Sequence, residues 1–215
     1  AEAIEEWLRW WAADFDGDFW ITNLTGAYGA MNLAGPRARK TLATVTGADL
    51  HGPRSRYMRA LEAEVAGVPA VLLRIGFVGE TGWEIHCPAD RALHVWDALI
   101  EAGAEHGIRP FGLEAQRVLR LEKGHIIVTQ DTDSVTTPIE AGMEWAVRFS
   151  KPDFVGRAAL IQLSQRGIVS RLVNFVMVDR EVPRVGEPVV AAGEPVGRVT
   201  SVRYSPGLDR GMGLA

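Results

Sequence analysis

The sequence contains a single cysteine, Cys87, among its 215 residues, so it cannot form an internal disulfide. It has no apolar run long enough to cross a bilayer, and no charged-then-apolar stretch of the kind that begins a secretory leader. It also has no block of Lys and Arg, and its net charge is −4, which argues against nucleic acid or an anionic membrane as a partner. Together these absences predict a protein of the reducing cytoplasm that has no nucleic-acid or membrane partner.

The apolar content, 47%, is ample for a buried core in one large domain or two small ones. At its start the chain enters an apolar helical pattern directly after Ala1, and it stops at Ala215 in what reads as the middle of an element. We therefore expect a piece of a longer polypeptide, a processed or tagged form being the alternative.

Helical and strand patterns alternate along the chain, with turn residues typical of hairpins, which predicts an α+β fold with antiparallel sheets rather than a parallel sheet. After Gly167 the pattern changes to short Val-rich runs separated by Pro and Gly, typical of a small β-barrel module. We predict two domains, residues 1–166 and 167–215. The expected helices are 2–13, 36–44, 88–103, 113–124 and 156–165, and the expected strands are 19–22, 28–33, 59–65, 69–77, 83–87, 143–149 and 168–178.

The segment Gly79–His86 (GETGWEIH) is the most informative motif of the chain. Two glycines frame a tight loop and a strand follows it, in which Trp83 and Ile85 face one side while Glu84 and His86 face the other. A carboxylate at that place can accept two parallel N–H bonds from a flat, amide-like ring. On these residues alone, a surface hairpin with a solvated Glu84 is the favoured interpretation.

Two other polar segments match ligand-binding loops only in part. Gly76–Gly82 lacks the Lys-Ser/Thr pair of a phosphate loop, and a strand follows it where a dinucleotide fingerprint requires a helix. Gln130–Asp133 lacks the glycine and terminal glutamate of a calcium loop, so we favour a polar turn. The histidines show no ligand pairing, and we predict no metal site. The charged residues of the helix at 113–124 predict a solvated face: Glu114, Arg117, Arg120, Glu122 and Lys123.

An ordered series of motifs resembles the folate-binding aminomethyltransferase family, the T-protein of glycine cleavage and its relatives. The resemblance begins at Arg74–Glu84 and spans nearly the whole chain. Its version of Gln130–Asp133, followed by Lys151–Gly156, looks most like the C-terminal part of the alpha subunit of heterotetrameric sarcosine oxidase. The other matching segments are Gly107–Glu114, Val118–Gly124, Thr137-Pro138, Gly197–Ser201 and Ser205-Pro206.

The resemblance implies a fold and a reaction. The fold would be the aminomethyltransferase fold, followed by its C-terminal barrel. Tetrahydrofolate would be the cofactor and would accept the one-carbon unit of an oxidised N-methyl amine, giving 5,10-methylenetetrahydrofolate. FAD and NAD would be bound only by other domains or subunits of the full enzyme, and the other sarcosine oxidase subunits would be partners.

The resemblance also implies roles for individual residues. Glu84 stands where the family has its pterin-binding glutamate, Phe77 stands where an aromatic, usually Tyr, lies beside the folate, and Tyr57 matches a second aromatic of that pocket. Gln116 replaces an arginine that holds the folate tail in T-proteins. The family's catalytic aspartate would lie upstream of Ala1, so we assign no catalytic residue within this chain and expect it to be inactive alone.

Two alternatives follow from the same resemblance. One is a glycine-cleavage T-protein that acts on an aminomethyl-lipoyl carrier without a flavin partner. The other is a non-catalytic folate-binding or assembly factor on the same fold. Relatives of that second kind carry a Lys-Gly-Cys-Tyr segment, whereas here Lys123-Gly124 is followed by His125-Ile126.

Overall fold

The computed structural model describes residues 2–215 of the chain. Its internal contacts divide the chain into two compact units. The first unit comprises the residues up to Gly76 together with Glu80–Pro110, and the second comprises Phe77–Gly79 together with Phe111–Ala215. In the described part of the chain, no helix combines the length and the apolar character needed to span a bilayer.

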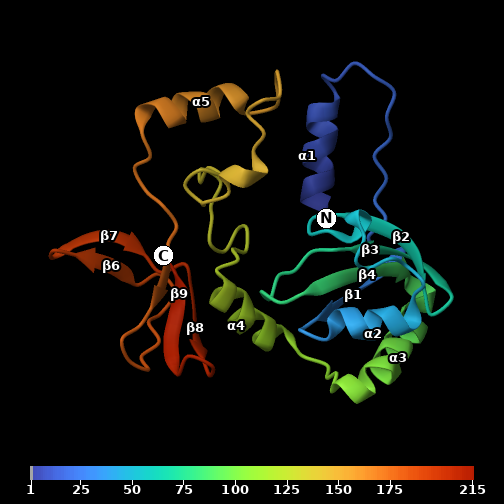
Figure 1. Ribbon diagram of the computed structural model, residues 1–215. Helices are drawn as coiled ribbons and strands as arrows, with labels where there is room; N and C mark the ends of the chain where they lie inside the picture. The colour runs from blue at the N-terminus through green and yellow to red at the C-terminus, as the bar shows by residue number, and fades with distance from the viewer. Residues whose placement is uncertain (1) are drawn as a thin grey trace. The chain divides into compact units, whose positions relative to one another are not determined.

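The first unit is built on a four-stranded antiparallel sheet (Figure 1). The strands are β1 (Tyr28–Ala34), β2 (Ala60–Val65), β3 (Val68–Leu73) and β4 (Gly82–Pro88), in the order β1-β4-β3-β2. Because β2 and β3 are joined by Ala66-Gly67, both with positive φ, they form the tight hairpin that the sequence predicts. Strand β4 is central: it pairs with β1 along one edge and with β3 along the other, so its side chains project only from the two faces of the sheet.

Helices α2 (Ala38–Val45) and α3 (Ala92–Gly103) pack against each other and against one face of this sheet (Figure 1). Alternate strand residues point toward them, as the period of two requires. The result is one apolar core, and burying a large aliphatic or aromatic side chain in such a core stabilises the fold by about 1.5–3 kcal/mol. Its most buried large members are Leu42, Leu72, Trp83, Ile85 and Val95.

The rest of the first unit is helical or irregular. Helix α1 (Glu2–Ala12) forms as its apolar period predicts, yet none of its residues is buried. The segment 19–22 that follows is not a strand, because it has no hydrogen-bonded partner strand among the described residues. Short 3-10 helices complete the unit: η1 (Pro53–Ser55), η2 (Ala89–Arg91) and η3 (Ala104–His106).

The second unit combines helices with short strands (Figure 1). Strands β5 (Asn174–Val176), β9 (Arg210–Leu214) and β8 (Ser201–Ser205) form one antiparallel sheet in that order, and β6 (Pro188–Ala191) pairs with β7 (Glu194–Arg198) as a separate hairpin. Helix α4 spans Leu113–Lys123, and its residue Leu121 packs on Met212 and Leu214 of β9. The remaining helices are η4 (Glu144–Ala146) and α5 (Arg157–Arg166).

Two strand predictions in the second unit are wrong in extent or kind. Residues 143–149 alternate apolar and polar side chains, but they contain the 3-10 turn η4, because Met143 N–H donates to Pro138 O and closes a turn instead of a sheet ladder. Of the expected strand 168–178, only Asn174–Val176 is regular, since its partner β9 is itself short and pairs with it over three residues.

A buried ionic network ties α4 to β8 within the second unit. Arg120 and Asp131 have side chains that are 1% and 0% exposed, and Arg120 Nη1 donates to Asp131 Oδ2 at 2.6 Å. The same carboxylate accepts bonds from Ile127 N–H and Thr200 Oγ1, both at 2.8 Å, and from the Ser201 hydroxyl. The predicted solvated face of α4 is therefore wrong at Arg120, whereas the predicted polar turn forms and Asp131 is its buried acceptor.

Candidate functional site

A glycine-rich loop, residues 76–82, leads into β4. Gly79 has φ +82°, which a residue with a side chain adopts only with strain, and a Cβ there would lie 3.1 Å from Lys123 Cβ. At Gly82 a Cβ would lie 3.0 Å from Leu33 O, so the first residue of β4 can pair closely with β1 only because it is glycine. Both requirements fix where β4 begins and therefore which of its residues face each way.

Trp83 locks that orientation. Trp83 is 1% exposed, and two guanidinium groups lie over its ring, with Arg39 Cζ at 5.2 Å and Arg74 Cζ at 4.8 Å from the ring centroid. Its indole N–H donates to Ser55 Oγ at 3.4 Å, and Arg74 Nη1 donates to Gly82 O at 3.1 Å. Burial lowers the pKa of Arg74 below its ordinary value. With Trp83 held in the core, Glu84 must point to the opposite face of the sheet.

Glu84 lies on that opposite face with a half-buried carboxylate. Its side chain is 34% exposed, and His86, two residues along, is 29% exposed. His86 Nε2 bonds to Glu84 Oε2 at 3.3 Å, while Glu84 Oε1 accepts no hydrogen bond from the described residues. The carboxylate of Glu84 is therefore partly covered, and its Oε1 has no partner among the described residues.

The neighbours of Glu84 across the sheet complete its surroundings. The register pairs Glu84 with Asn32 of β1 on one side and with Leu73 of β3 on the other. Residues directly opposite one another share a face, with Cβ atoms about 4.5–5.5 Å apart. An amide therefore flanks the carboxylate on one side and an apolar side chain flanks it on the other. The alternation pattern of β4 could not identify Asn32, because it says nothing of which strand lies beside β4.

Phe77 belongs to the second compact unit, whereas Glu84 belongs to the first. Its ring stacks on the imidazole of His125, with centroids 5.8 Å apart and an interplanar angle of 22°. His125 Nδ1 donates to Phe77 O at 2.7 Å, so both the ring and the backbone of Phe77 are held by one residue. No pattern in the sequence predicts this contact, because His125 lies after α4, 48 residues along the chain from Phe77.

Tyr57 lies in the same unit as Glu84, between η1 and β2. Its side chain is 57% exposed and makes no hydrogen bond with the described residues. The next residue, Met58, donates its N–H to Arg74 O, which places Tyr57 beside the end of β3 that carries Leu73. Tyr57 therefore lies near that end of β3, and its ring is exposed.

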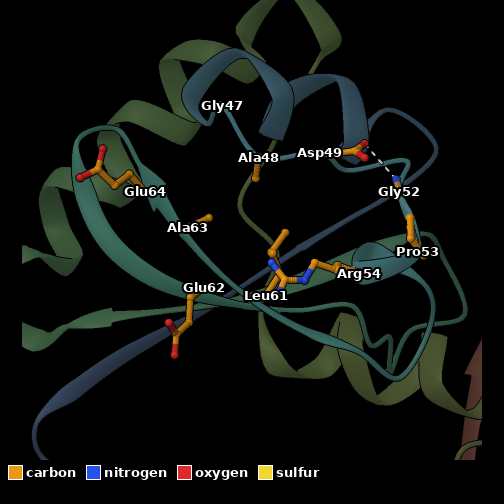
Figure 2. A pocket seen from close by; sticks show the side chains of 10 residues that line it. All are labelled: Gly47, Ala48, Asp49, Gly52, Pro53, Arg54, Leu61, Glu62, Ala63 and Glu64. Carbon is orange, nitrogen blue, oxygen red and sulfur yellow. Dashed lines mark hydrogen bonds between the residues drawn. The ribbon is translucent and has the colours of Figure 1, made fainter.

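A separate pocket of about 440 Å³ lies along the edge strand β2 (Figure 2). It is lined by residues 47–49 and 52–54, which lie between α2 and β2, and by residues 61–64 of β2. Of its three carboxylates, Asp49, Glu62 and Glu64, the first accepts hydrogen bonds from the backbone N–H groups of His51 and Gly52, both at 2.9 Å, and these bonds lower the pKa of Asp49. Asp49 therefore holds its own turn through these bonds. None of the predicted site residues lines the pocket, so we do not assign the functional site to this pocket.

Comparison with known families matches the chain in two segments. Residues 1–151 match the GCVT N-terminal domain, and residues 171–215 match the glycine cleavage T-protein C-terminal barrel domain. The expected aminomethyltransferase fold, with antiparallel sheets, packed helices and a C-terminal barrel domain, is thereby confirmed. The division between residues 166 and 167 stays a prediction.

Individual relatives agree with the family match. The chain is 35% identical over 214 residues to an aminomethyltransferase of Halothermothrix orenii and 37% identical over 216 residues to one of Geobacillus thermodenitrificans. In both cases the alignment covers 100% of this chain and 59% of the relative, so the chain spans little more than half the length of these relatives.

Solved structures give the same result. The glycine cleavage system aminomethyltransferase T from Bartonella henselae superimposes with a TM-score of 0.83 at 27% identity, over 100% of this chain and 57% of that chain. A heterotetrameric sarcosine oxidase from Corynebacterium covers 52% of this chain with a TM-score of 0.44, too low to carry an argument. The finer assignment to a sarcosine oxidase alpha subunit is therefore not confirmed. On the match over residues 1–151 and the agreement of its relatives, the chain belongs to the glycine cleavage T-protein family.

Proposed function

We propose that this chain supplies the folate-binding part of a tetrahydrofolate-dependent aminomethyltransferase of the glycine cleavage T-protein type. The observation that carries the proposal is the carboxylate of Glu84, which projects from the open face of the four-stranded sheet with one oxygen free of partners. Family membership supports the reaction class, and the aminomethyltransferase names of the relatives support this reading over a flavin-linked one.

The residues fit the head of a reduced folate. A pterin presents a ring N–H and an exocyclic amino group side by side, and one carboxylate can accept both bonds. Each bond to a charged acceptor is worth about 1.5–3 kcal/mol. His86 donates to the other side of the Glu84 carboxylate, which would restrict its rotation and orient it for the ligand. Leu73, opposite Glu84, supplies an apolar surface next to the flat ring.

When bound, tetrahydrofolate supplies the nitrogen nucleophiles that take up a one-carbon unit. The contribution of this chain is to bind and orient. Glu84 fixes the direction of the pterin, and the ring of Tyr57 in the same unit offers it a flat apolar contact. The resemblance predicts a contact of Phe77 with the folate, in which a ring without a hydroxyl would donate no hydrogen bond. Gln116 on α4 is neutral where T-proteins have an arginine, so it would hold an anionic folate tail less strongly.

A second candidate is the folate-binding part of a sarcosine oxidase alpha subunit. The observation in its favour is the run Gln130–Asp133, followed by Lys151–Gly156, which resembles that branch of the family. The two candidates differ in the donor of the one-carbon unit. Formation of 5,10-methylenetetrahydrofolate from an aminomethyl-lipoyl carrier supports the T-protein, and its formation from sarcosine with consumption of oxygen supports the oxidase.

Titration of folinic acid into the complete gene product tests the role of Glu84. Glu84→Ala removes both bonds to the pterin, so the dissociation constant should rise by tenfold or more, as the loss of even one charge-assisted bond of about 1.5–3 kcal/mol requires. Glu80→Ala is the matched control, since Glu80 lies in the same loop but is exposed. An unchanged affinity in Glu84→Ala would show that the pterin is not bound by this residue.

A further inference from the structure

The pocket beside β2 reaches the apolar core of the first unit (Figure 2). Three of its lining residues pack against the buried core cluster yet are only partly buried themselves: Ala48, Leu61 and Ala63. Its volume, about 440 Å³, falls within the range of about 300–1,000 Å³ that is typical of small-ligand sites. The pocket lies entirely within the first unit and offers an apolar floor to a small ligand.

Strand β2 is an edge strand, and its main chain borders this pocket. Glu64 lies opposite Pro69 of β3, and because proline has no N–H, this is an open pair of the ladder. Open and hydrogen-bonded pairs alternate, so the main-chain groups of Glu62 and Glu64 both point to the free edge. Thr46 Oγ1 donates to Glu64 O at 2.6 Å from that side. Glu62 N–H and C=O have no partner among the described residues, which leaves one donor and one acceptor at the pocket.

Of the residues that line the pocket, Arg54 alone is cationic, and it forms no ion pair with the described residues. Its side chain reaches toward the middle of the lining residues, whereas the side chains of Glu62 and Glu64 project outward (Figure 2). Asp49 Oδ1 already accepts the two N–H groups of its own turn. The guanidinium of Arg54 is therefore available to an anionic group of a ligand, and its planar donors match a carboxylate.

We propose that this pocket binds an apolar α-amino acid unit with a free carboxylate, at a site separate from that of the folate. Two residues of an antiparallel ladder exchange two N–H···O bonds, and Glu62 can exchange the same two bonds with one amino acid unit. Glu62 C=O accepts from the ligand nitrogen, Glu62 N–H donates to a carboxylate oxygen, and Arg54 pairs with the carboxylate. The apolar side chain of the ligand then lies on Ala48, Leu61 and Ala63. A free amino acid and the C-terminal residue of a peptide share this chemistry.

Calorimetric titration of the complete gene product with related ligands tests the chemistry of the site. L-Leucine should bind saturably, and L-leucinamide, which lacks the carboxylate, should bind about tenfold more weakly or worse. L-Serine should also bind more weakly, because it has no apolar side chain for the floor. N-acetyl-L-leucine keeps one N–H and the carboxylate: tighter binding than that of L-leucine identifies a peptide C-terminus as the ligand, and weaker binding identifies a free amino acid. The absence of saturable binding by both carboxylates would refute the proposal.

Variants of the pocket test its location. Arg54→Met should weaken L-leucine by about tenfold and leave L-leucinamide within about twofold, because only the first ligand has a carboxylate to pair. Arg56→Met is the matched control, an exposed arginine two residues away that does not line the pocket, and it should change neither affinity. A Cβ at Gly47 would meet no atom within 4 Å, so Gly47→Phe should block L-leucine and leave the Tm unchanged. Equal weakening of both ligands by Arg54→Met, or unchanged binding in Arg54→Met and Gly47→Phe, would show that the carboxylate is not bound here.

The amino acid site and the folate site can fail independently. Glu84→Ala should leave the affinity for L-leucine unchanged, and Arg54→Met should leave the affinity for folinic acid unchanged. If Glu84→Ala abolishes the binding of L-leucine, or folinic acid displaces it competitively, the amino acid occupies the site at Glu84 and its assignment to the pocket is wrong. If the wild type binds L-leucine through Arg54 but binds no folinic acid, the proposed function fails while this inference stands.

Discussion

Removing the carboxylate of Asp131 should destabilise the second unit more than any exposed charge deletion. The Asp131→Ala variant leaves the Arg120 guanidinium, 1% exposed, without its counter-ion, and it also leaves Ile127 N–H and the Thr200 hydroxyl without their acceptor. Breaking one side of a buried ion pair costs about 3–5 kcal/mol, because the remaining charge stays in a medium that solvates it poorly. The free energy of unfolding from urea titration, followed by circular dichroism, should fall by that amount.

Two further variants make this test specific. Glu114→Ala breaks the ion pair with Arg117, whose side chains are 70% and 47% exposed, and should leave the urea midpoint unchanged within error. The double variant Arg120→Met with Asp131→Leu replaces both charges by apolar groups and should recover the part of the lost stability that the unpaired charge causes, while Ile127 N–H and the Thr200 hydroxyl stay without their acceptor. A loss below about 1 kcal/mol in Asp131→Ala, the size of one ordinary hydrogen bond, would refute the buried network.

Two other predictions concern titrating groups in the first unit. Cys87 is fully buried, and its burial, with a smaller effect of Asp90, raises the pKa of its thiol. A disulfide reagent at pH 8 should therefore label Cys87 only after the protein is unfolded in urea. Rapid labelling of the folded protein would contradict the burial of this thiol. Bonds from His51 and Gly52 N–H lower the pKa of Asp49 from 3.8, so its stabilising effect should be complete above about pH 4 and disappear as the pH falls through the lowered value. The difference in Tm between wild type and Asp49→Ala should therefore shrink on acidification, and a difference that grows would show the opposite sign of coupling.

Local chemistry predicts the elements that depend on it. Helix α4 ends at Lys123 because Gly124 follows with φ +79°, the left-handed conformation that glycine adopts at a helix end, and the predicted end lies within one residue of the observed one. The β2–β3 hairpin forms about Ala66-Gly67 for a similar reason. Such signals act within a few residues, so the sequence contains all the information needed to place them.

Predictions failed where a distant segment decides the outcome. Arg120 has the spacing of a solvated helix face, and a helical wheel offers no reason to bury it. It is buried because Ser201 and Asp131, far apart in the chain, surround it and accept its bonds at 2.7 and 2.6 Å. The alternation in 143–149 likewise suggests a strand, but a strand needs a neighbour, and the backbone there closes a turn instead.

The candidate site shows the same division between local and distant information. Alternation along β4 placed Glu84 on the face opposite Trp83, and the structure has it there. The partner of Glu84 could not be found in this way, because Asn32 lies in a strand that precedes both α2 and the β2–β3 hairpin in the chain. The assignments of Glu84, Phe77 and Tyr57 to a folate site remain predictions for binding experiments.

The core itself determines which polar residues meet at the site. Because side chains alternate along a strand, burying Leu33 against Trp83 on the helix-covered face forces Asn32 and Glu84 to lie side by side on the other. A slip of one residue would bring Asn32 into the apolar core and Leu33 out of it, at a cost in both burial and desolvation. The pairing of a carboxylate with an amide on the open face is therefore fixed by apolar packing on the closed face. A substitution that shifts the register of β1 would therefore move Asn32 away from Glu84, although it changes neither of these residues.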